Sequence, residues 1–171
     1  MWILVSYLIG SIPIAKFVAK RELNFYSTSE VIRELGWRKG IYVGIVDISK
    51  GILAVSLATY FGLPAWATLL SGLSAVAGQI FPAFNSFRGG GGLLTSYGAL
   101  LVINSTLASV AFVIVVPFIV IRKPWVGIIL AWVLLHTWAI MIGEYKFVNF
   151  GTGHVIMVAV AYLTRTYESR R

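Results

Sequence analysis

Residues 51–87 read GILAVSLATYFGLPAWATLLSGLSAVAGQIFPAFNSF and contain no aspartate, glutamate, lysine or arginine. A helix that spans a membrane needs about 20 consecutive, mainly apolar residues. This stretch is long enough for two such helices, and Gly62 and Pro64 provide a turn between them. It therefore predicts an integral membrane protein built from α-helices.

The rest of the chain continues the same pattern. Residues 89–121 and 124–143 also lack charged side chains, and we expect the first of these runs to form two short helices that meet near Asn104. Only 12% of the 171 residues are charged, against about 25% in soluble domains. We predict one all-α, polytopic membrane domain over residues 1–171, with about seven transmembrane helices near 2–19, 39–61, 65–84, 92–103, 106–121, 125–142 and 149–165.

The net charge of +8 follows this expected topology, so it does not indicate nucleic-acid binding. The connections on one side, with the C-terminal tail, hold Lys20, Arg21, Arg33, Arg38, Lys39, Arg88, Arg122, Lys123, Arg170 and Arg171, whereas the other side holds Lys146. Cytoplasmic loops of membrane proteins are enriched in lysine and arginine. We therefore expect an external N-terminus, a cytoplasmic C-terminus and a multi-pass protein of the inner (plasma) membrane with its active face in the cytoplasm.

A glycine-rich stretch carries the strongest chemical signal. Arg88 precedes the four consecutive glycines Gly89, Gly90, Gly91 and Gly92, and an apolar run that contains Thr95 follows them. Glycines let the backbone expose its N–H groups, and the start of a helix adds partial positive charge. Such a loop binds anions, usually phosphate, although it also occurs as a simple flexible turn.

Titratable side chains also lie inside the predicted helices. Asp47 and Lys50 are three residues apart, so they share a helix face and are able to pair. Two interpretations remain open: a structural pair whose lysine extends toward the cytoplasm, or a lysine that lines a substrate pocket. We interpret His136 as a neutral packing residue and Lys16 as a lysine that extends to the membrane surface.

Residues 20–38 form the longest polar connection. Ser27 or Thr28 is suited to cap a short helix that Gly36 ends. Arg33 would lie on this helix, either paired with Glu30 or bound to the same phosphate as the glycine-rich loop. The chain has no cysteine, and its two histidines fall on different predicted helices, so we expect no metal site.

Four segments, residues 7–13, 31–36, 46–51 and 78–90, occur in an order and spacing that resembles the bacterial acyl-phosphate:glycerol-3-phosphate acyltransferase family (PlsY). The resemblance covers about residues 5–100. It implies a seven-helix inner-membrane enzyme that transfers a fatty acyl group from acyl phosphate to glycerol 3-phosphate and forms lysophosphatidic acid. It implies no cofactor, no metal and no acyl-CoA. Membrane lipid is a further expected partner, and the oligomeric state stays open.

The resemblance also implies roles for individual residues. Phosphate binding falls to Arg33, Arg88, Gly89, Gly90, Gly91, Gly92 and Thr95, and the catalytic candidates are Ser27, Ser29 and Arg33. Asp47, Lys50 and Gln79 are expected at a possible pocket. The sequence departs from the family pattern at Gly91, where a lysine is usual, and at Gln79, where a histidine is usual.

A third departure concerns the tail. Residues 164–171 contain neither the histidine nor the asparagine that the family carries after its last helix. The alternative hypothesis is therefore a catalytically inactive paralogue that binds a phosphorylated lipid or a partner enzyme. A small transporter is a further hypothesis, which the absence of an inverted repeat disfavours.

Overall fold

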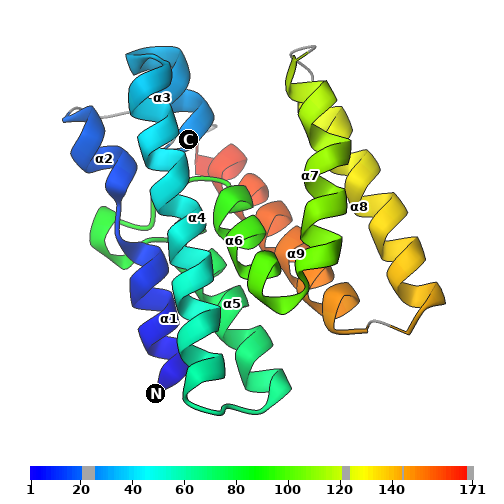
Figure 1. The fold of residues 1–171 in the computed structure, drawn as a ribbon. Coiled ribbons are helices and arrows are strands. Elements are labelled where there is room, and N and C mark those ends of the chain that lie inside the picture. The colour runs from blue at the N-terminus through cyan, green and yellow to red at the C-terminus, as the bar shows by residue number, and fades with distance from the viewer. Residues whose placement is uncertain (21–25, 121–123, 144, 169–171) are drawn as a thin grey trace.

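A computed structural model describes residues 1–20, 26–120, 124–143 and 145–168. Throughout this part of the chain the elements are helices (Figure 1). They are α1 (Trp2–Ser11), α2 (Ile14–Ala19), α3 (Thr28–Leu35), α4 (Trp37–Tyr60), α5 (Ala65–Ile80), the 3₁₀ turn η1 (Ala83–Asn85), α6 (Leu93–Ile103), α7 (Ser105–Val120), α8 (Pro124–Met141) and α9 (Tyr145–Glu168). The predicted all-α class is confirmed.

Each predicted hydrophobic segment contains a helix, although its bounds differ in places. Three segments of the described chain are long and apolar enough to cross a membrane, namely Trp2–Ala19, Trp37–Tyr60 and Ala65–Asn85. The apolar stretches Leu93–Ile103, Ser105–Phe118, Val126–Met141 and Val148–Val160 are shorter. The helix expected over 65–84 ends at Ile80, because Pro82 cannot continue the ladder of helical hydrogen bonds.

The short helix expected in the polar connection is α3. The Ser27 hydroxyl accepts a hydrogen bond from the Glu30 backbone N–H at 3.3 Å, which caps the N-terminus. Gly36 ends the helix with a φ of 87°, a conformation that glycine adopts without steric cost. The two end signals were therefore read correctly from the sequence.

The first hydrophobic segment, expected to form one helix near 2–19, is interrupted. Ile12 has an extended backbone (φ −64°, ψ 113°), and α2 starts after Pro13. A proline has no N–H and its ring disturbs the preceding turn, so the helix breaks here. The break takes the Ile12 carbonyl out of the helical hydrogen-bond pattern: it accepts from the Ile14 N–H at 3.0 Å and from a side chain of another helix.

Glycines bring two pairs of helices into backbone contact. At the α4–α6 contact, Gly51 lies against the carbonyl of Thr95 and Gly98 lies against the carbonyl of Ile48, so closely that a Cβ at either glycine would collide. The α1–α5 contact repeats this arrangement with Gly10 and Gly78. Small residues at helix crossings are typical of membrane proteins, where close packing drives association.

A buried cluster joins these pairs to the last helix. Val55, Val76, Ile80 and Ala99 are fully buried, and Phe150 of α9 packs among them. The helices α7 and α8 pack against each other on the side of α6 that is away from α1 (Figure 1). The loop between α5 and α6 lies against the end of α5 and the residues before α3, since Gly89 lies against the Gln79 carbonyl and Gly90 against the Tyr26 carbonyl.

We expect Gly98→Ala to destabilise the protein, because the new methyl group would collide with the Ile48 carbonyl. Overpacking of this kind costs about 1–3 kcal/mol. The measurement is the melting temperature of the detergent-purified protein. Gly91→Ala is the matched control, since a Cβ at that position meets no atom within 4 Å. Equal melting temperatures for the two variants would contradict the close contact between α4 and α6.

Candidate functional site

The glycine-rich loop is anchored to the end of α5. The Gly90 N–H donates to the Gln79 carbonyl at 3.1 Å, and a Cβ at Gly89 would collide with the same carbonyl oxygen. Gly92 precedes α6 with a φ of 72°, which a residue with a side chain rarely adopts. A Cβ at Gly90 would lie 2.8 Å from the Tyr26 carbonyl oxygen. Close contacts at Gly89 and Gly90 and the positive φ at Gly92 therefore explain why these three positions need glycine.

A second set of contacts holds the arginine that precedes the glycines. The Asn85 Nδ2 donates to the Arg88 carbonyl at 2.5 Å, and the Lys16 Nζ donates to Asn85 Oδ1 at 2.8 Å. Lys16 thus supports the loop from α2, a contact that the sequence did not predict. The Arg88 side chain itself is exposed.

Lys50 lies at the centre of a buried polar network. Its Nζ donates to Asp47 Oδ1 at 2.9 Å, to Gln79 Oε1 at 2.7 Å and to the Ile12 carbonyl at 2.7 Å. An ammonium group has three N–H donors, and all three are used here. The predicted pairing of Asp47 with Lys50 is confirmed, but the lysine points into the protein and does not extend toward the membrane surface.

The remaining atoms of the network are satisfied as well. The Gln79 Nε2 donates to Asp47 Oδ2 at 3.0 Å, so the amide uses both of its ends. The Thr28 side chain also hydrogen-bonds to Asp47, which ties α3 to α4. A buried ion pair is tolerated when its lone pairs and protons all have partners. The network therefore joins α3, α4, α5 and the break after α1.

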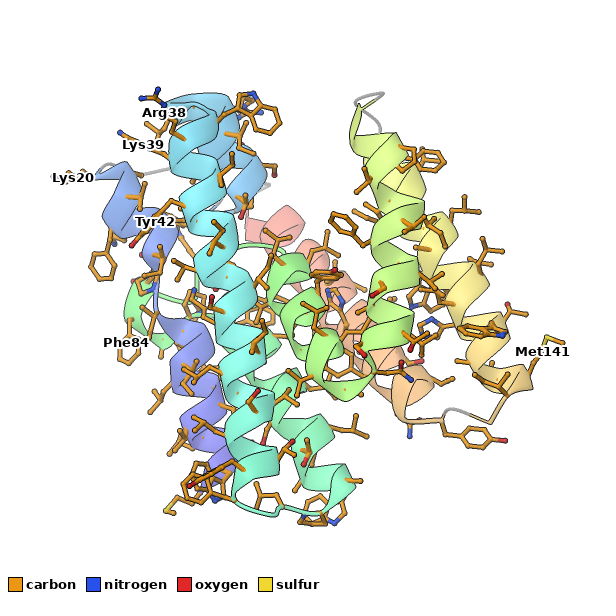
Figure 2. The ribbon with its side chains drawn as sticks, viewed as in Figure 1. Lys20, Arg38, Lys39, Tyr42, Phe84 and Met141 are labelled. Atoms are coloured by element: carbon orange, nitrogen blue, oxygen red, sulfur yellow. The ribbon has the colours of Figure 1, made fainter. Side chains whose placement is uncertain are left out.

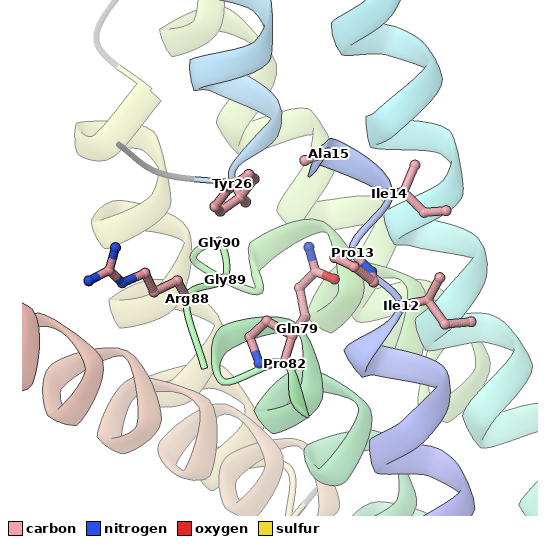
Figure 3. A pocket seen from close by; sticks show the side chains of 10 residues that line it. All are labelled: Ile12, Pro13, Ile14, Ala15, Tyr26, Gln79, Pro82, Arg88, Gly89 and Gly90. Carbon is pink, nitrogen blue, oxygen red and sulfur yellow. The ribbon is translucent and has the colours of Figure 1, made fainter. Parts of the chain in front are cut away.

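A small pocket opens between the helix break and the glycine-rich loop (Figure 3). Its walls come from the residues around the break, from Tyr26, from the end of α5 and from the loop, and they are Ile12, Pro13, Ile14, Ala15, Tyr26, Gln79, Pro82, Arg88, Gly89 and Gly90. Gln79 was predicted here, and it lines the pocket. Asp47 and Lys50 do not line it, because they lie behind Gln79 in the network.

The catalytic candidates lie at the start of α3. The hydroxyls of Ser27 and Ser29 are 3.1 Å apart, and the Ser27 backbone is adjacent to Gly90. The structure thus brings this serine to the loop. Arg33 lies on the same helix, but its described partners are Glu30 at 2.6 Å and Glu34 at 3.5 Å, and two thirds of its side chain is exposed. The pair with Glu30, which is itself buried, is therefore the arrangement observed.

The last predicted positions occupy the end of the loop and the start of α6. Gly91 is exposed and faces open space. Thr95 is fully buried, and its hydroxyl has no hydrogen-bond partner in the described structure. His136, predicted as a packing residue, has its Nδ1 2.9 Å from the Trp132 carbonyl and packs against Gly151. The side chains of the tail, residues 161–171, lie outside what the structure describes.

Sequence analysis missed three residues that contact the loop. Asn85 and Lys16 form the support described above, and His154 of α9 lies against the Gly91 backbone. Asn85 stands three residues before Arg88, a spacing typical of a side chain that closes a turn. Lys16 and His154 come from distant helices, so no local pattern connects them to the loop.

Comparisons with known proteins agree with this architecture. The chain is 38% identical over 122 residues to glycerol-3-phosphate acyltransferase 1 of Deinococcus radiodurans, 41% over 113 residues to the enzyme of Enterococcus faecalis, and 36% over 129 residues to that of Thermus thermophilus. These matches cover 67%, 61% and 71% of this chain, but only 62%, 52% and 65% of the relatives' own length.

The fold is similar to that of two crystal structures of PlsY, described as an integral membrane glycerol 3-phosphate acyltransferase. The lysophosphatidic acid form gives a TM-score of 0.78 at 22% identity, and the glycerol 3-phosphate form gives 0.77 at 21%. Each match covers 99% of this chain and 92% of the other. The family model described as glycerol-3-phosphate acyltransferase matches residues 1–170. With its helical membrane architecture and anchored glycine-rich loop, this chain belongs to the glycerol-3-phosphate acyltransferase family.

Proposed function

We propose that this protein is a membrane acyltransferase that moves a fatty acyl group from acyl phosphate to glycerol 3-phosphate and forms lysophosphatidic acid in phospholipid synthesis. Family membership over residues 1–170 is the observation that carries the proposal. The anchored loop at 89–92 supports it, because a phosphate site is the first requirement for both substrates.

The reaction requires one bond to form and one to break. The 1-hydroxyl oxygen of glycerol 3-phosphate attacks the acyl carbonyl, the carbon–oxygen bond to phosphate breaks, and inorganic phosphate leaves with the bonding electrons. The proton of the hydroxyl passes to a phosphate oxygen of the substrates. No covalent acyl-enzyme is needed, so the protein contributes by positioning both substrates and stabilising negative charge.

The loop is suited to hold the phosphate of acyl phosphate. Its anchors at Gln79 and Asn85 fix the backbone before substrate arrives, and Gly92 places the start of α6 directly behind it. A prearranged set of N–H donors loses little free energy to reorganisation when charge develops. Arg88, exposed beside the loop, adds a mobile positive charge for the same group.

We propose further that the chain acts as one domain with seven membrane helices and that the loop faces the cytoplasm of a bacterial inner membrane. Lys20, Arg38 and Lys39 lie toward one end of the helices, and the N-terminus lies at the opposite end (Figures 1 and 2). Exposed basic side chains favour the cytoplasmic side. Membrane lipid surrounds the exposed apolar side chains.

Incubation of the detergent-purified protein with palmitoyl phosphate and labelled glycerol 3-phosphate tests the activity directly. We expect labelled lysophosphatidic acid, and we expect Arg33→Ala to lower its formation at least tenfold if the exposed guanidinium binds substrate phosphate, in line with a charged hydrogen bond. Arg38→Ala is the matched control, since Arg38 is also exposed on the same side. Absence of product beside an active relative would favour the inactive paralogue.

We expect Gly91→Lys to raise kcat/KM about tenfold or more, because it adds a positive charge at a position with room for a side chain. A donor aimed at developing negative charge is commonly worth about 3–4 kcal/mol. Gly91→Met is the uncharged control of similar length. Equal activity of the lysine and methionine variants would show that position 91 does not face the reacting phosphate.

The orientation is open to a labelling experiment, since the chain has no cysteine of its own. We expect a membrane-impermeant maleimide to label Ala65→Cys in intact bacterial cells and to label Lys39→Cys only after the cells are opened. Both positions are exposed. Lys39 lies at the start of α4, and Ala65 starts α5, shortly after the other end of α4. Labelling of Lys39→Cys in intact cells would contradict the proposed orientation and indicate the opposite one.

A further inference from the structure

The turn that leads into the glycine-rich loop has an unfavourable backbone conformation. Ser86 and Phe87 have φ values of 50° and 59°, so two consecutive residues with side chains lie in the left-handed region. The Cβ atom is crowded by the backbone in this region, and bulky residues rarely adopt it. Such a conformation persists only where surrounding contacts hold it.

Hydrogen bonds across the turn provide this restraint. The N–H groups of Asn85 and Phe87 donate to the Pro82 carbonyl at 3.2 and 3.0 Å. The Arg88 N–H donates to the Asn85 carbonyl at 2.9 Å, and the Asn85 side chain donates back to the Arg88 carbonyl. Because Asn85 is buried, water does not readily replace the side-chain bond.

Lys16 of α2 fixes the orientation of the Asn85 amide. A side-chain amide has an oxygen that accepts and a nitrogen that donates. The Lys16 ammonium group only donates, so its 2.8 Å contact requires the oxygen end of the amide. The nitrogen end is thereby turned toward the Arg88 carbonyl. A cation from another helix thus selects the amide orientation that closes the turn.

Arg88 connects the turn to the proposed phosphate site. It directly precedes the glycines, lines the pocket together with Gly89 and Gly90, and has an exposed side chain (Figure 3). The position of a backbone determines which space its side chain reaches. The turn therefore controls where the positive charge of Arg88 lies.

We propose that Lys16 and Asn85 are positioning residues of the phosphate site. They hold the strained turn that precedes the loop and thereby place Arg88 and the following glycines for an anionic phosphate group. Lys16 acts through Asn85 and does not touch the substrate. The proposal deepens the acyltransferase function and rests on it for the identity of the phosphate.

The first test measures binding and needs no turnover. The melting temperature of the full-length protein in detergent is compared with inorganic phosphate and with sodium chloride of equal ionic strength. We expect phosphate to raise it in the natural protein and in Lys39→Met, the matched control. Lys16→Met and Asn85→Leu should each lose most of this rise. Lys16→Met keeps an apolar stem and leaves the turn sequence intact, so it decides the question should Asn85→Leu not fold.

A rescue variant separates positioning from simple attraction of phosphate by a lysine. Ser86→Gly removes the steric cost of the left-handed conformation without restoring charge. It should favour the native turn about fivefold or more. We therefore expect Ser86→Gly to recover at least half of the phosphate-dependent rise that Lys16→Met loses. A lysine that acts only by its charge would not be replaced in this way.

The acyltransferase assay adds a kinetic readout. We expect Asn85→Leu and Lys16→Met to raise the KM for palmitoyl phosphate about tenfold, in line with one weakened charged hydrogen bond. The kcat should change less, because the loss concerns binding in the ground state as well as in the transition state. A purely structural role would lower the melting temperature without moving this KM.

The outcomes separate this proposal from the function on which it rests. Phosphate stabilisation that depends on Lys16 and returns with Ser86→Gly, without any lysophosphatidic acid, would support the positioning role and contradict the acyltransferase reaction. Turnover with an unchanged KM and unchanged phosphate stabilisation in Lys16→Met would overturn the positioning role and leave the reaction intact. Failure of Ser86→Gly to restore the phosphate effect, or absence of that effect in the natural protein, would also overturn the positioning role.

Discussion

The hydrogen bonds of the Lys50 ammonium group link the packing of the helices to the position of the glycine-rich loop. The ammonium group has three N–H donors and uses them on a carboxylate, an amide and the Ile12 backbone carbonyl, which the break at Pro13 takes out of the helical hydrogen-bond pattern. Inside an apolar helix bundle an unpaired charge is very costly, so the helices that supply these acceptors must pack together. The break after α1 and the charged pair in α4 therefore belong to one interaction, in which the break supplies a carbonyl acceptor and Lys50 supplies the donor.

Gln79 connects the Lys50 network to the glycine-rich loop. Its side chain completes the network with Lys50 and Asp47, while its backbone carbonyl accepts a hydrogen bond from Gly90. The residue therefore places the loop relative to the most constrained polar group of the bundle. A loop held in this way has a fixed backbone conformation, which matters for the proposed acyl transfer because its catalysis is largely positioning.

The fold shows what surrounds Gly91 and Gln79, the two positions of the described site that depart from the family pattern. Gly91 lacks the usual lysine, but the position is open, and a histidine from the last helix lies against it. Gln79 stands in place of a histidine and still joins two partners at once, because an amide has a donor end and an acceptor end. Comparison of the motifs along the chain shows only which side chains are missing. The folded structure shows which residues of other helices lie at those positions.

The sequence by itself determined the all-α membrane class, the positions of the hydrophobic segments, both ends of α3 and the pairing of Asp47 with Lys50. These features depend on local rules, namely apolar length, capping residues and helical spacing, so they are visible without the fold. Tertiary structure alone decided the remaining features. The third partner of Lys50, the support of Arg88 by Lys16 through Asn85, and the approach of His154 to Gly91 join residues from different helices. Long-range packing sets such contacts, and no local pattern in the sequence records it.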